Sequence, residues 1–397
     1  MNLLPLLILA AAASFARWQP ALPGLPSHRV HSLEKESSDR LAEVPVSLQG
    51  NEALRKATNL FRGAIQGSET VAVEEDGSLL MLDKYNYVWH ASADAAAPGG
   101  YRLADRPINY LGTGRPLGFK KDAQGNLIVC NSNQGLIKLQ GSVVVLLSAR
   151  VSDDSPIEPG SHITYANDLD ISKDGTIYFT DSHDIPVLQN WGTARPWFDT
   201  FTSYLFGLYS GSKTGRLLAY YPNNRTTHVL AKGLWYANGV AVSADGSFVA
   251  VAETNQFRIL RYWLKGPMAG SVDTLIDRLP GFPDGVSRAS DGGFWVAMPG
   301  RRTGLLKALR IKSIRSILPW LPAWLKPKVS PWGALMKVSS NGQIKKFLED
   351  PTGQHVAFVS AIEEERLDKL DQQGNTILRL FLGNIVQDYV SYLDITA

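Results

Sequence analysis

Residues 236–246 read YANGVAVSADG, and residues 165–175 read YANDLDISKDG. Each stretch places an Asn before an alternating apolar run, which is typical of a strand, and then ends in a polar turn with a Gly. The same unit, a strand, a turn ending in Gly and a second strand, occurs six times between residues 67 and 383. Six copies of one antiparallel unit predict an all-β fold, a six-bladed β-propeller.

The turn glycines give a common reference point for comparing the copies. Eight residues before the glycines at 77, 125, 175, 246 and 292 stand Glu69, Leu117, Asn167, Asn238 and Asp284. A single Asn-Gly pair would indicate only a turn. Side-chain oxygens at four of five equivalent positions favour a shared site, because the innermost strand of each propeller blade begins at the central channel.

The four oxygen-bearing residues, Glu69, Asn167, Asn238 and Asp284, combine two carboxylates with two amides. Hard cations that accept irregular, high coordination prefer such ligands, so Ca²⁺ is the predicted metal and Mg²⁺ the second choice. No His or Cys stands at these positions, which disfavours zinc. Four protein ligands leave coordination positions for water and a substrate.

Several long motifs carry a family resemblance at this point: "YANDLDISKDGTIYFTDS", "YANGVAVSADGSFVAVAET" and "LPGFPDGVSRASDGGFWVAM". The chain resembles the six-bladed calcium propellers that include paraoxonase and gluconolactonase. It is most similar to their strictosidine synthase-like branch, the adipocyte plasma membrane-associated protein family. The resemblance covers roughly residues 50 to 390 and implies calcium held by the same four residues and hydrolysis of aryl esters or lactones.

Two catalytic candidates lie outside the ligand set. His183, in "FTDSH", follows a strand of the Asn167 blade and is a candidate general base, although a hydrogen-bonded loop histidine is the competing interpretation. The resemblance places the catalytic glutamate of a strictosidine synthase near Glu364, with Glu363 or Glu365 as alternatives. The histidine pair of paraoxonase-like enzymes, around the position of Leu117, is absent from this chain.

Residues 301–332 differ in composition from the repeats. They hold eight Lys or Arg and no Asp or Glu, and Leu and Ile recur among them at helical spacing. This pattern predicts a basic amphipathic helix inserted in a blade. A lid over the channel and a contact with an anionic membrane surface, with Trp320 and Trp324 at headgroup level, both fit it. A helix packed on the propeller with a solvated basic face is the third interpretation.

The N-terminal residues indicate the compartment. Residues 3–16 form a short apolar run that ends in small residues, which predicts a signal peptide or signal anchor over 1–16, a linker over 17–48 and the propeller over 49–397. We therefore expect the secretory pathway, meaning endoplasmic reticulum lumen, vacuole, extracellular space or periplasm, with N-terminal anchoring as an alternative. Asn224, in Asn-Arg-Thr, is then a candidate glycosylation site.

Lys plus Arg number 40 and Asp plus Glu 37, a net charge of +3, so nucleic acid is not an expected partner. The sequence thus predicts a calcium-dependent hydrolase of esters, lactones or other aromatic substrates. Two alternatives remain at this point. One is a condensing or lyase-type enzyme that works through Glu364, and the other is a non-catalytic, membrane-associated ligand-binding propeller.

Overall fold

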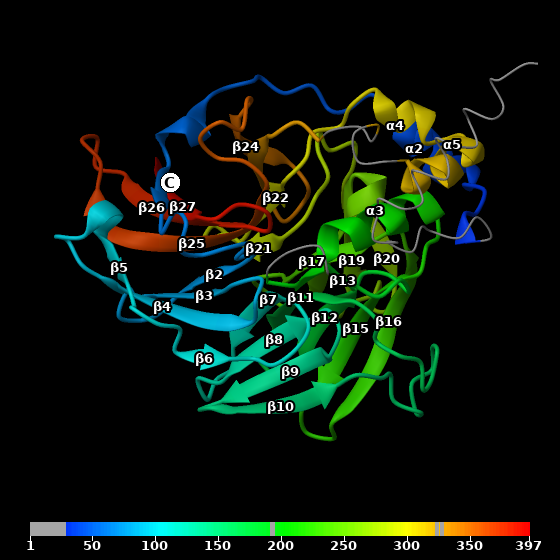
Figure 1. The fold of residues 1–397 in the computed structure, drawn as a ribbon, viewed down its shortest axis with the longest axis horizontal. Coiled ribbons are helices and arrows are strands. Elements are labelled where there is room, and N and C mark those ends of the chain that lie inside the picture. The colour runs from blue at the N-terminus through cyan, green and yellow to red at the C-terminus, as the bar shows by residue number, and fades with distance from the viewer. Residues whose placement is uncertain (1–28, 191–194, 322–324, 326–328) are drawn as a thin grey trace, which may run out of the picture.

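A computed structural model describes residues 29–190, 195–321, 325 and 329–397. Within them, six antiparallel sheets are arranged around one central axis (Figure 1), which confirms the predicted six-bladed propeller. The expected signal segment at 1–16 and Trp324 lie outside the described residues.

The first three blades follow one another along the chain. Blade one contains β2 (Val71–Val73), β3 (Leu79–Leu82), β4 (Tyr87–Ala93) and β5 (Tyr101–Leu103), with β6 (Asn109–Tyr110) paired to β4. Blade two contains β7 (Pro116–Lys121), β8 (Leu127–Asn131), β9 (Gly135–Gln140) and β10 (Val143–Ser148). Blade three contains β11 (Ala166–Ile171), β12 (Ile177–Asp181), β15 (Gly215–Tyr221) and β16 (Thr226–Leu234).

The remaining blades repeat this order and close the ring. Blade four contains β17 (Ala237–Val242), β18 (Phe248–Glu253), β19 (Arg258–Trp263) and β20 (Val272–Ile276). Blade five contains β21 (Val286–Arg288), β22 (Phe294–Met298), β23 (Gly333–Val338) and β24 (Ile344–Asp350). Blade six contains β25 (Val359–Leu370), β26 (Thr376–Asn384) and β27 (Val390–Thr396), and its outer strand is the N-terminal β1 (Thr58–Leu60).

The core lies between neighbouring blades. All six residues of β18 are buried, as are all five of β22, because each of these strands has a blade against both of its faces. Such strands read as continuous apolar runs instead of alternating ones. Cys130, in β8, is fully buried and packs as a small apolar side chain.

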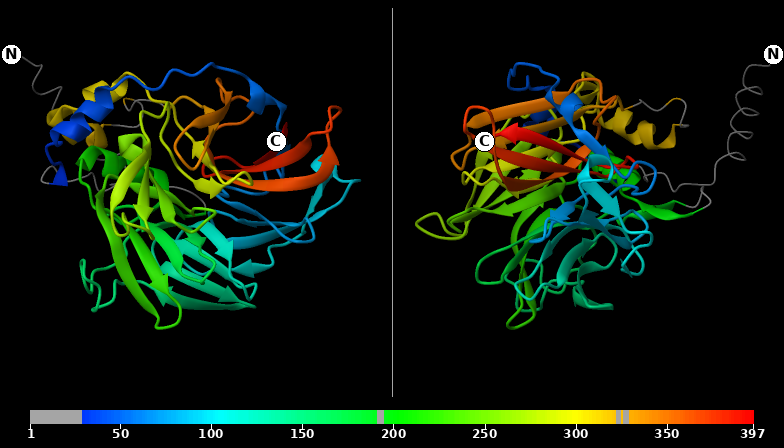
Figure 2. Two further views of the ribbon diagram at one scale, coloured as in Figure 1. Left: turned by 180° about the vertical axis from the view of Figure 1, so that it is seen from behind. Right: turned by 90° about the vertical axis from the view of Figure 1, so that its left-hand side faces the viewer.

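The helices gather at one side of the molecule, at the upper right of Figure 1 and in both views of Figure 2. They are α2 (Lys35–Ala42), α3 (Thr200–Ser210), α4 (Leu305–Ala308) and α5 (Lys312–Ile317), with the 3₁₀ turns η4 (Thr254–Gln256) and η5 (Leu318–Trp320) beside them. Two further 3₁₀ turns lie apart from this group, η2 (Ala53–Lys56) against β24 and η3 (Pro98–Gly100) against β1. None of the described helices is long and apolar enough to cross a bilayer.

The insertion of blade five differs from the expected single amphipathic helix. It consists of the short helices α4 and α5 followed by η5, and its basic residues are not all on a solvated face. Arg315 is fully buried and donates to the carbonyl oxygens of Tyr209 and His31 (2.8 and 2.7 Å). Tyr209 lies in the last turn of α3, where carbonyl groups lack partners within the helix, so the guanidinium is drawn inward.

Candidate metal centre

The innermost strands share one irregularity at the start of the channel. In β7, β11, β17 and β25 the pairing with the second strand skips a residue, so that Asn167–Asp168 and Asn238–Gly239 lie in β-bulges. A bulge interrupts the alternation of side chains and re-aims one of them. The bulge therefore explains why a strand bounded by buried apolar residues begins with an amide.

The four predicted ligands lie at equivalent positions at this end of the channel. Each of the four stands two residues before the apolar residue from which pairing with the second strand runs on without a break, which is Val71, Leu169, Val240 or Val286. All four are buried, with relative exposures of 3 to 7%. The structure thus brings together residues that are up to 215 positions apart in the sequence.

Three oxygen atoms of this set are buried without a hydrogen-bond partner: Oε2 of Glu69, Oδ1 of Asn167 and Oδ1 of Asn238. The amide nitrogens of the same two Asn residues are satisfied, since they donate to Ser182 Oγ (2.8 Å) and Thr254 Oγ1 (3.2 Å). Each amide is therefore held with its oxygen free. An unpaired buried acceptor costs about 1–3 kcal/mol, and a bound cation would satisfy all three.

The charges of the site point the same way. Burial, the neighbouring Asp284 and Asp168 raise the pKa of Glu69 well above its usual range, and Arg115 partly offsets them. Burial also raises the pKa of Asp284 to about 8, with a hydrogen bond from Asn238 acting in the opposite direction. No group of three or more His, Cys, Asp or Glu among the described residues could hold a metal, so an ion here requires the two amides. The donor set fits Ca²⁺.

The backbones of the innermost strands are joined at the level of the ligands. Gly239 N donates to Asp284 O (3.0 Å), and Gly285 N donates to Ser360 O (2.8 Å). A side chain at Gly239 would overlap the backbone of residues 284–286. The side chain of Asp168 accepts from Val240 N (3.1 Å), which fixes β11 to β17. These contacts hold the four ligands on a rigid frame, and Asp168 takes the orienting role.

Ser360 occupies the sixth equivalent position of the ring. Counting eight residues back from a turn glycine did not identify it. Strand β25 extends to Leu370, so the turn glycine of blade six is displaced. The motif "VSAI", matched to "ANDL" and "ANGV", could have revealed it. Ser360 is buried, and its hydroxyl donates to Glu69 O (3.1 Å), so it holds the backbone of a ligand instead of facing the channel with a free oxygen.

Arg115 is a second residue that sequence reasoning missed. It stands two residues before Leu117, the equivalent position of blade two, and is 1% exposed. Its Nη2 donates to Gly67 O (2.8 Å), whereas Nε and Nη1 are buried without a partner. Two buried guanidinium nitrogens beside a predicted carboxylate ligand therefore have no acceptor within the described protein. They offer hydrogen bonds to an oxygen atom of a bound molecule.

Aromatic side chains cover the channel mouth. Tyr165 and Tyr204 both pack edge-on against Tyr236, with ring centroids 5.7 and 5.1 Å apart. Tyr204 comes from α3, in the segment that joins β12 to β15, so this segment lies at the entrance. Burial and the nearby Asp284 raise the pKa of both Tyr204 and Tyr236 well above the usual range, so both hydroxyls stay protonated.

His183 does not lie free at the channel mouth. Its side chain is fully buried, and its ring packs against Gly207 of α3. Nδ1 lies 3.0 Å from Ile185 N and 2.9 Å from Asp184 Oδ1, and Nε2 lies 3.4 Å from Ser210 Oγ. Both ring nitrogens have partners within the protein. The arrangement is that of the hydrogen-bonded loop histidine, and it does not support a general base at His183.

Glu364 is also placed apart from the four ligands. Its carboxylate accepts from Ser290 N (2.8 Å) and from Trp295 Nε1 (2.5 Å), both in blade five. Its neighbour Glu363 instead pairs with Lys120 of β7 (2.8 Å), further along the innermost strands. The geometry therefore gives Glu364 a structural role between two blades, which corrects the expectation of a catalytic glutamate there.

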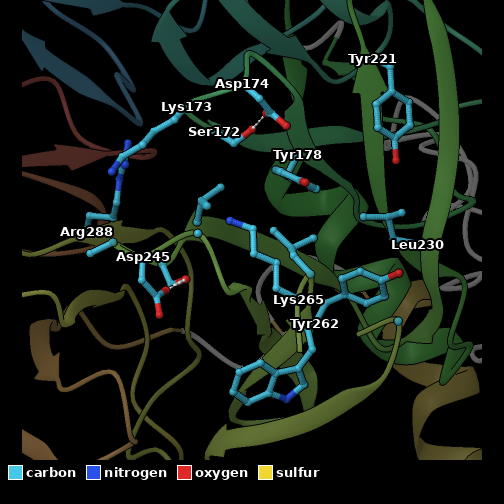
Figure 3. A pocket seen from close by; sticks show the side chains of 17 residues that line it. Ser172, Lys173, Asp174, Tyr178, Tyr221, Leu230, Asp245, Tyr262, Lys265 and Arg288 are labelled. Atoms are coloured by element: carbon cyan, nitrogen blue, oxygen red, sulfur yellow. Dashed lines mark hydrogen bonds between the residues drawn. The ribbon is translucent and has the colours of Figure 1, made fainter. Parts of the chain in front are cut away.

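The opposite end of the strands carries a separate pocket of about 440 Å³, between blades three and four (Figure 3). Tyr178, Tyr262 and Lys265 line it together with Ser172, which follows the end of β11. Asn224 lies in the exposed turn from β15 to β16, and Thr226 Oγ1 donates to its Oδ1 (2.9 Å). Glycosylation of Asn224 stays a prediction. The metal centre is reached from the other end.

Comparison with known proteins places this geometry in context. The family model described as strictosidine synthase matches residues 167–267, which carry two of the four ligand positions. The chain is 36% identical to strictosidine synthase-like protein 13 of Arabidopsis thaliana over 287 residues, 70% of this chain and 61% of that protein. It is 32% identical to the adipocyte plasma membrane-associated protein of Rattus norvegicus over 336 residues, 80% and 83% of the two chains.

Solved structures share the fold at low sequence identity. A gluconolactonase from Xanthomonas campestris superposes with a TM-score of 0.53 at 18% identity, covering 88% of this chain and 96% of that one. Regucalcin from Agrobacterium tumefaciens, described as a calcium-binding protein, gives a TM-score of 0.50 at 12% identity, covering 85% and 93%. At these identities the likeness establishes the propeller and leaves the chemistry to the residues of the channel.

Proposed function

The chain belongs to the strictosidine synthase-like family, which includes the adipocyte plasma membrane-associated proteins, and from this membership and its channel residues we propose that it is a calcium-dependent hydrolase of esters or lactones. The observation that carries the proposal is the set of buried, unpaired oxygens on Glu69, Asn167 and Asn238. The names of two structural neighbours, gluconolactonase and calcium-binding regucalcin, are in keeping with it.

Glu69, Asn167, Asn238 and Asp284 would hold the ion. A bound Ca²⁺ supplies Lewis-acid polarisation of a carbonyl oxygen and stabilises the negative charge that develops on it. Ligands fixed on the starts of rigid strands need little rearrangement during the reaction, which is the condition under which electrostatic stabilisation is effective.

The channel's own residues would bind and orient the substrate. Arg115 interacts electrostatically with Glu69 and has two buried nitrogens without a partner, which would donate hydrogen bonds to a substrate oxygen. Tyr204 and Tyr236 present protonated hydroxyls near Asp284 and could donate to a second oxygen. Their rings exclude water and form an apolar wall, which favours substrates with an aromatic or aliphatic portion.

The decisive experiment is metal analysis of the purified protein together with assays on aryl esters and lactones, before and after chelation. We expect about one calcium per chain and turnover that is lost with chelator and recovered with Ca²⁺. Metal-independent turnover, or a protein that binds calcium without turning over any ester or lactone, would contradict the hydrolase. The second outcome would leave the ligand-binding propeller as the better interpretation.

Replacing Asn238 by Ala tests one ligand at a time. The change removes an unpaired oxygen from the site and leaves the strand frame in place, so we expect weaker calcium binding and lower turnover with an unchanged β-sheet circular dichroism spectrum. Asn133→Ala, an exposed Asn at the same end of the channel, is the control and should leave calcium affinity unchanged. Equal calcium titrations of the Asn238→Ala and parent proteins would remove Asn238 from the ligand set.

Calcium binding should also release protons. The pKa of Asp284 is raised to about 8 without metal, so its carboxyl is largely protonated at pH 7 and has to ionise to bind a cation. Calorimetry in buffers of different ionisation enthalpy should therefore detect proton release at pH 7. Calcium affinity should fall as the pH drops below about 8. Affinity that is constant between pH 6 and 8.5 would refute this assignment.

A further inference from the structure

The blade-five insertion exposes large apolar side chains at the surface formed by the described residues. Leu305, Ile311, Ile317 and Trp320 are 42, 52, 58 and 58% exposed within sixteen residues; we term these four side chains the docking face. The opposite side of the same insertion is tightly packed, since Leu306 and Leu309 are buried in the core between α2, α3 and the blades. The docking face therefore points away from the propeller.

The four described Arg side chains of the insertion, at positions 301, 302, 310 and 315, have hydrogen-bond or ion-pair partners within the protein. Arg310 donates to Ser38 Oγ (3.0 Å), and Arg302 donates to the carbonyl oxygens of Arg40 and Glu43 (2.6 and 2.7 Å). Lys307 and Lys312, in contrast, are exposed and have no ion pair among the described residues. Two free ammonium groups thus stand among the four apolar side chains.

The docking face lies at the end of the channel that carries the proposed metal ligands. The insertion joins the end of β22 to β23, which is the end of the channel where the metal ligands lie, and α5 and η5 contact α3 over the mouth. The chain also enters the fold here, because His31 N donates to Ser210 O (2.7 Å) and Arg315 holds His31 O. The apolar run of residues 3–16 precedes this point by few residues.

We propose that the docking face inserts into the interface of an anionic lipid bilayer, with Lys307 and Lys312 contacting acidic headgroups and Trp320 at headgroup depth. Apolar side chains flanked by Lys and a Trp are the composition that favours the membrane interface. A protein partner would have to supply acidic groups around an apolar surface, whereas an anionic bilayer presents both along its whole area. The proposal does not depend on calcium binding or hydrolysis.

The single cysteine, Cys130, is fully buried, which allows a site-specific test on the full chain. Ile317→Cys and, as a matched control, Leu146→Cys would each be labelled with an environment-sensitive fluorophore. Ile317 and Leu146 are both 58% exposed, but Leu146 lies on β10 at the edge of blade two. The unsubstituted protein taken through the same labelling gives the background.

With vesicles containing phosphatidylserine, we expect the label at 317 to shift to shorter wavelength and become protected from acrylamide quenching. The label at 146 should remain in water even when the protein sediments with the vesicles. A label at 317 that stays accessible on vesicle-bound protein would overturn the proposal. A label at 317 that is shielded without lipid would also overturn the proposal. Shielding that is independent of protein concentration would assign the docking face to the chain's own N-terminal segment, and shielding that rises with protein concentration would assign it to a second copy of the chain.

The charge component has its own test. Lys307→Gln/Lys312→Gln should raise the lipid concentration needed for the spectral shift by about tenfold on anionic vesicles, and should change little on phosphatidylcholine alone. Added salt should have the same effect on the unsubstituted protein. A variant that titrates like the parent on anionic vesicles, or a parent that titrates equally in low and high salt, would show that the two lysines do not contact headgroups.

Discussion

Glu69→Gln/Asp284→Asn is expected to abolish calcium binding and to reduce ester or lactone turnover by at least about a hundredfold, since it removes both negative charges from the proposed site. The variant keeps the size and shape of both side chains and one acceptor oxygen on each, and it replaces the second oxygen by an NH2 donor. Isothermal titration with Ca²⁺ and steady-state kinetics measure the two losses. Glu363→Gln, which removes a carboxylate paired with Lys120 further along the channel, is the matched control and should retain calcium binding.

The same variant has an expected effect on stability with the opposite sign. Burial holds the pKa of Asp284 at about 8, above that of an unfolded Asp, so the calcium-free protein loses stability as the pH rises from about 4 to 8. Removing the carboxyl should therefore raise the melting temperature of calcium-free protein at pH 8. It should also eliminate the increase that calcium gives to the parent. A calcium-dependent increase that survives in the variant would show that the metal binds elsewhere.

Gly383→Ala is expected to impair folding and calcium binding together. Gly383 lies near the end of β26, and a methyl group there would overlap the carbonyl oxygen of Glu69 and approach Thr70 N to 3.1 Å. Because the obstacle is backbone, relief requires a shift of the segment that carries a proposed ligand. Overpacking of this kind costs about 1–3 kcal/mol. Chemical denaturation and calcium titration measure the two effects.

The control for Gly383→Ala is Gly304→Ala. Gly304 precedes α4, and a methyl group there meets no atom within 4 Å. We expect parent-like stability and calcium affinity from the control. Calcium affinity that is unchanged in a destabilised Gly383→Ala protein would mean that the position of Glu69 is not set by its contact with β26.

The sixfold repeat allowed the fold and the positions of the proposed ligands to be predicted from the sequence. The Asp-Gly turns recur at a fixed distance from the bulges, because each innermost strand spans the same length of channel, so counting back reached Asn167 and Asn238. In blade six the longer strand β25 broke that distance, and Ser360 was missed. A reference point at the bulge itself would not have been affected.

The remaining features depended on contacts between distant segments. Arg115 precedes an apolar residue at the equivalent position, and nothing in its local sequence shows that two of its nitrogens are buried without partners. The sequence left two interpretations of His183 open, and only its packing against α3 decides for the hydrogen-bonded loop histidine. Arg315 belongs to a segment predicted as a basic helix, and its burial depends on the carbonyl oxygen that α3 offers it. Insertions pack where the tertiary structure allows, and their amphipathic pattern does not specify the partner.

The closure of the ring by β1 and β27 has a consequence for the order in which the protein can be assembled during translation. Thr58 pairs with Tyr392, and Leu60 with Val390, so the outer strand of blade six has no partner in the nascent chain until residues 390–392 have left the ribosome. The segment with Glu69, which adjoins β1, then gains its contacts with Gly383 and Ser360. Pairings of such long sequence separation form slowly, since the loop must close before any contact stabilises it. Synthesis of β27 should therefore precede formation of a high-affinity calcium site, and ribosome-bound chains that end before β27 should bind calcium weakly.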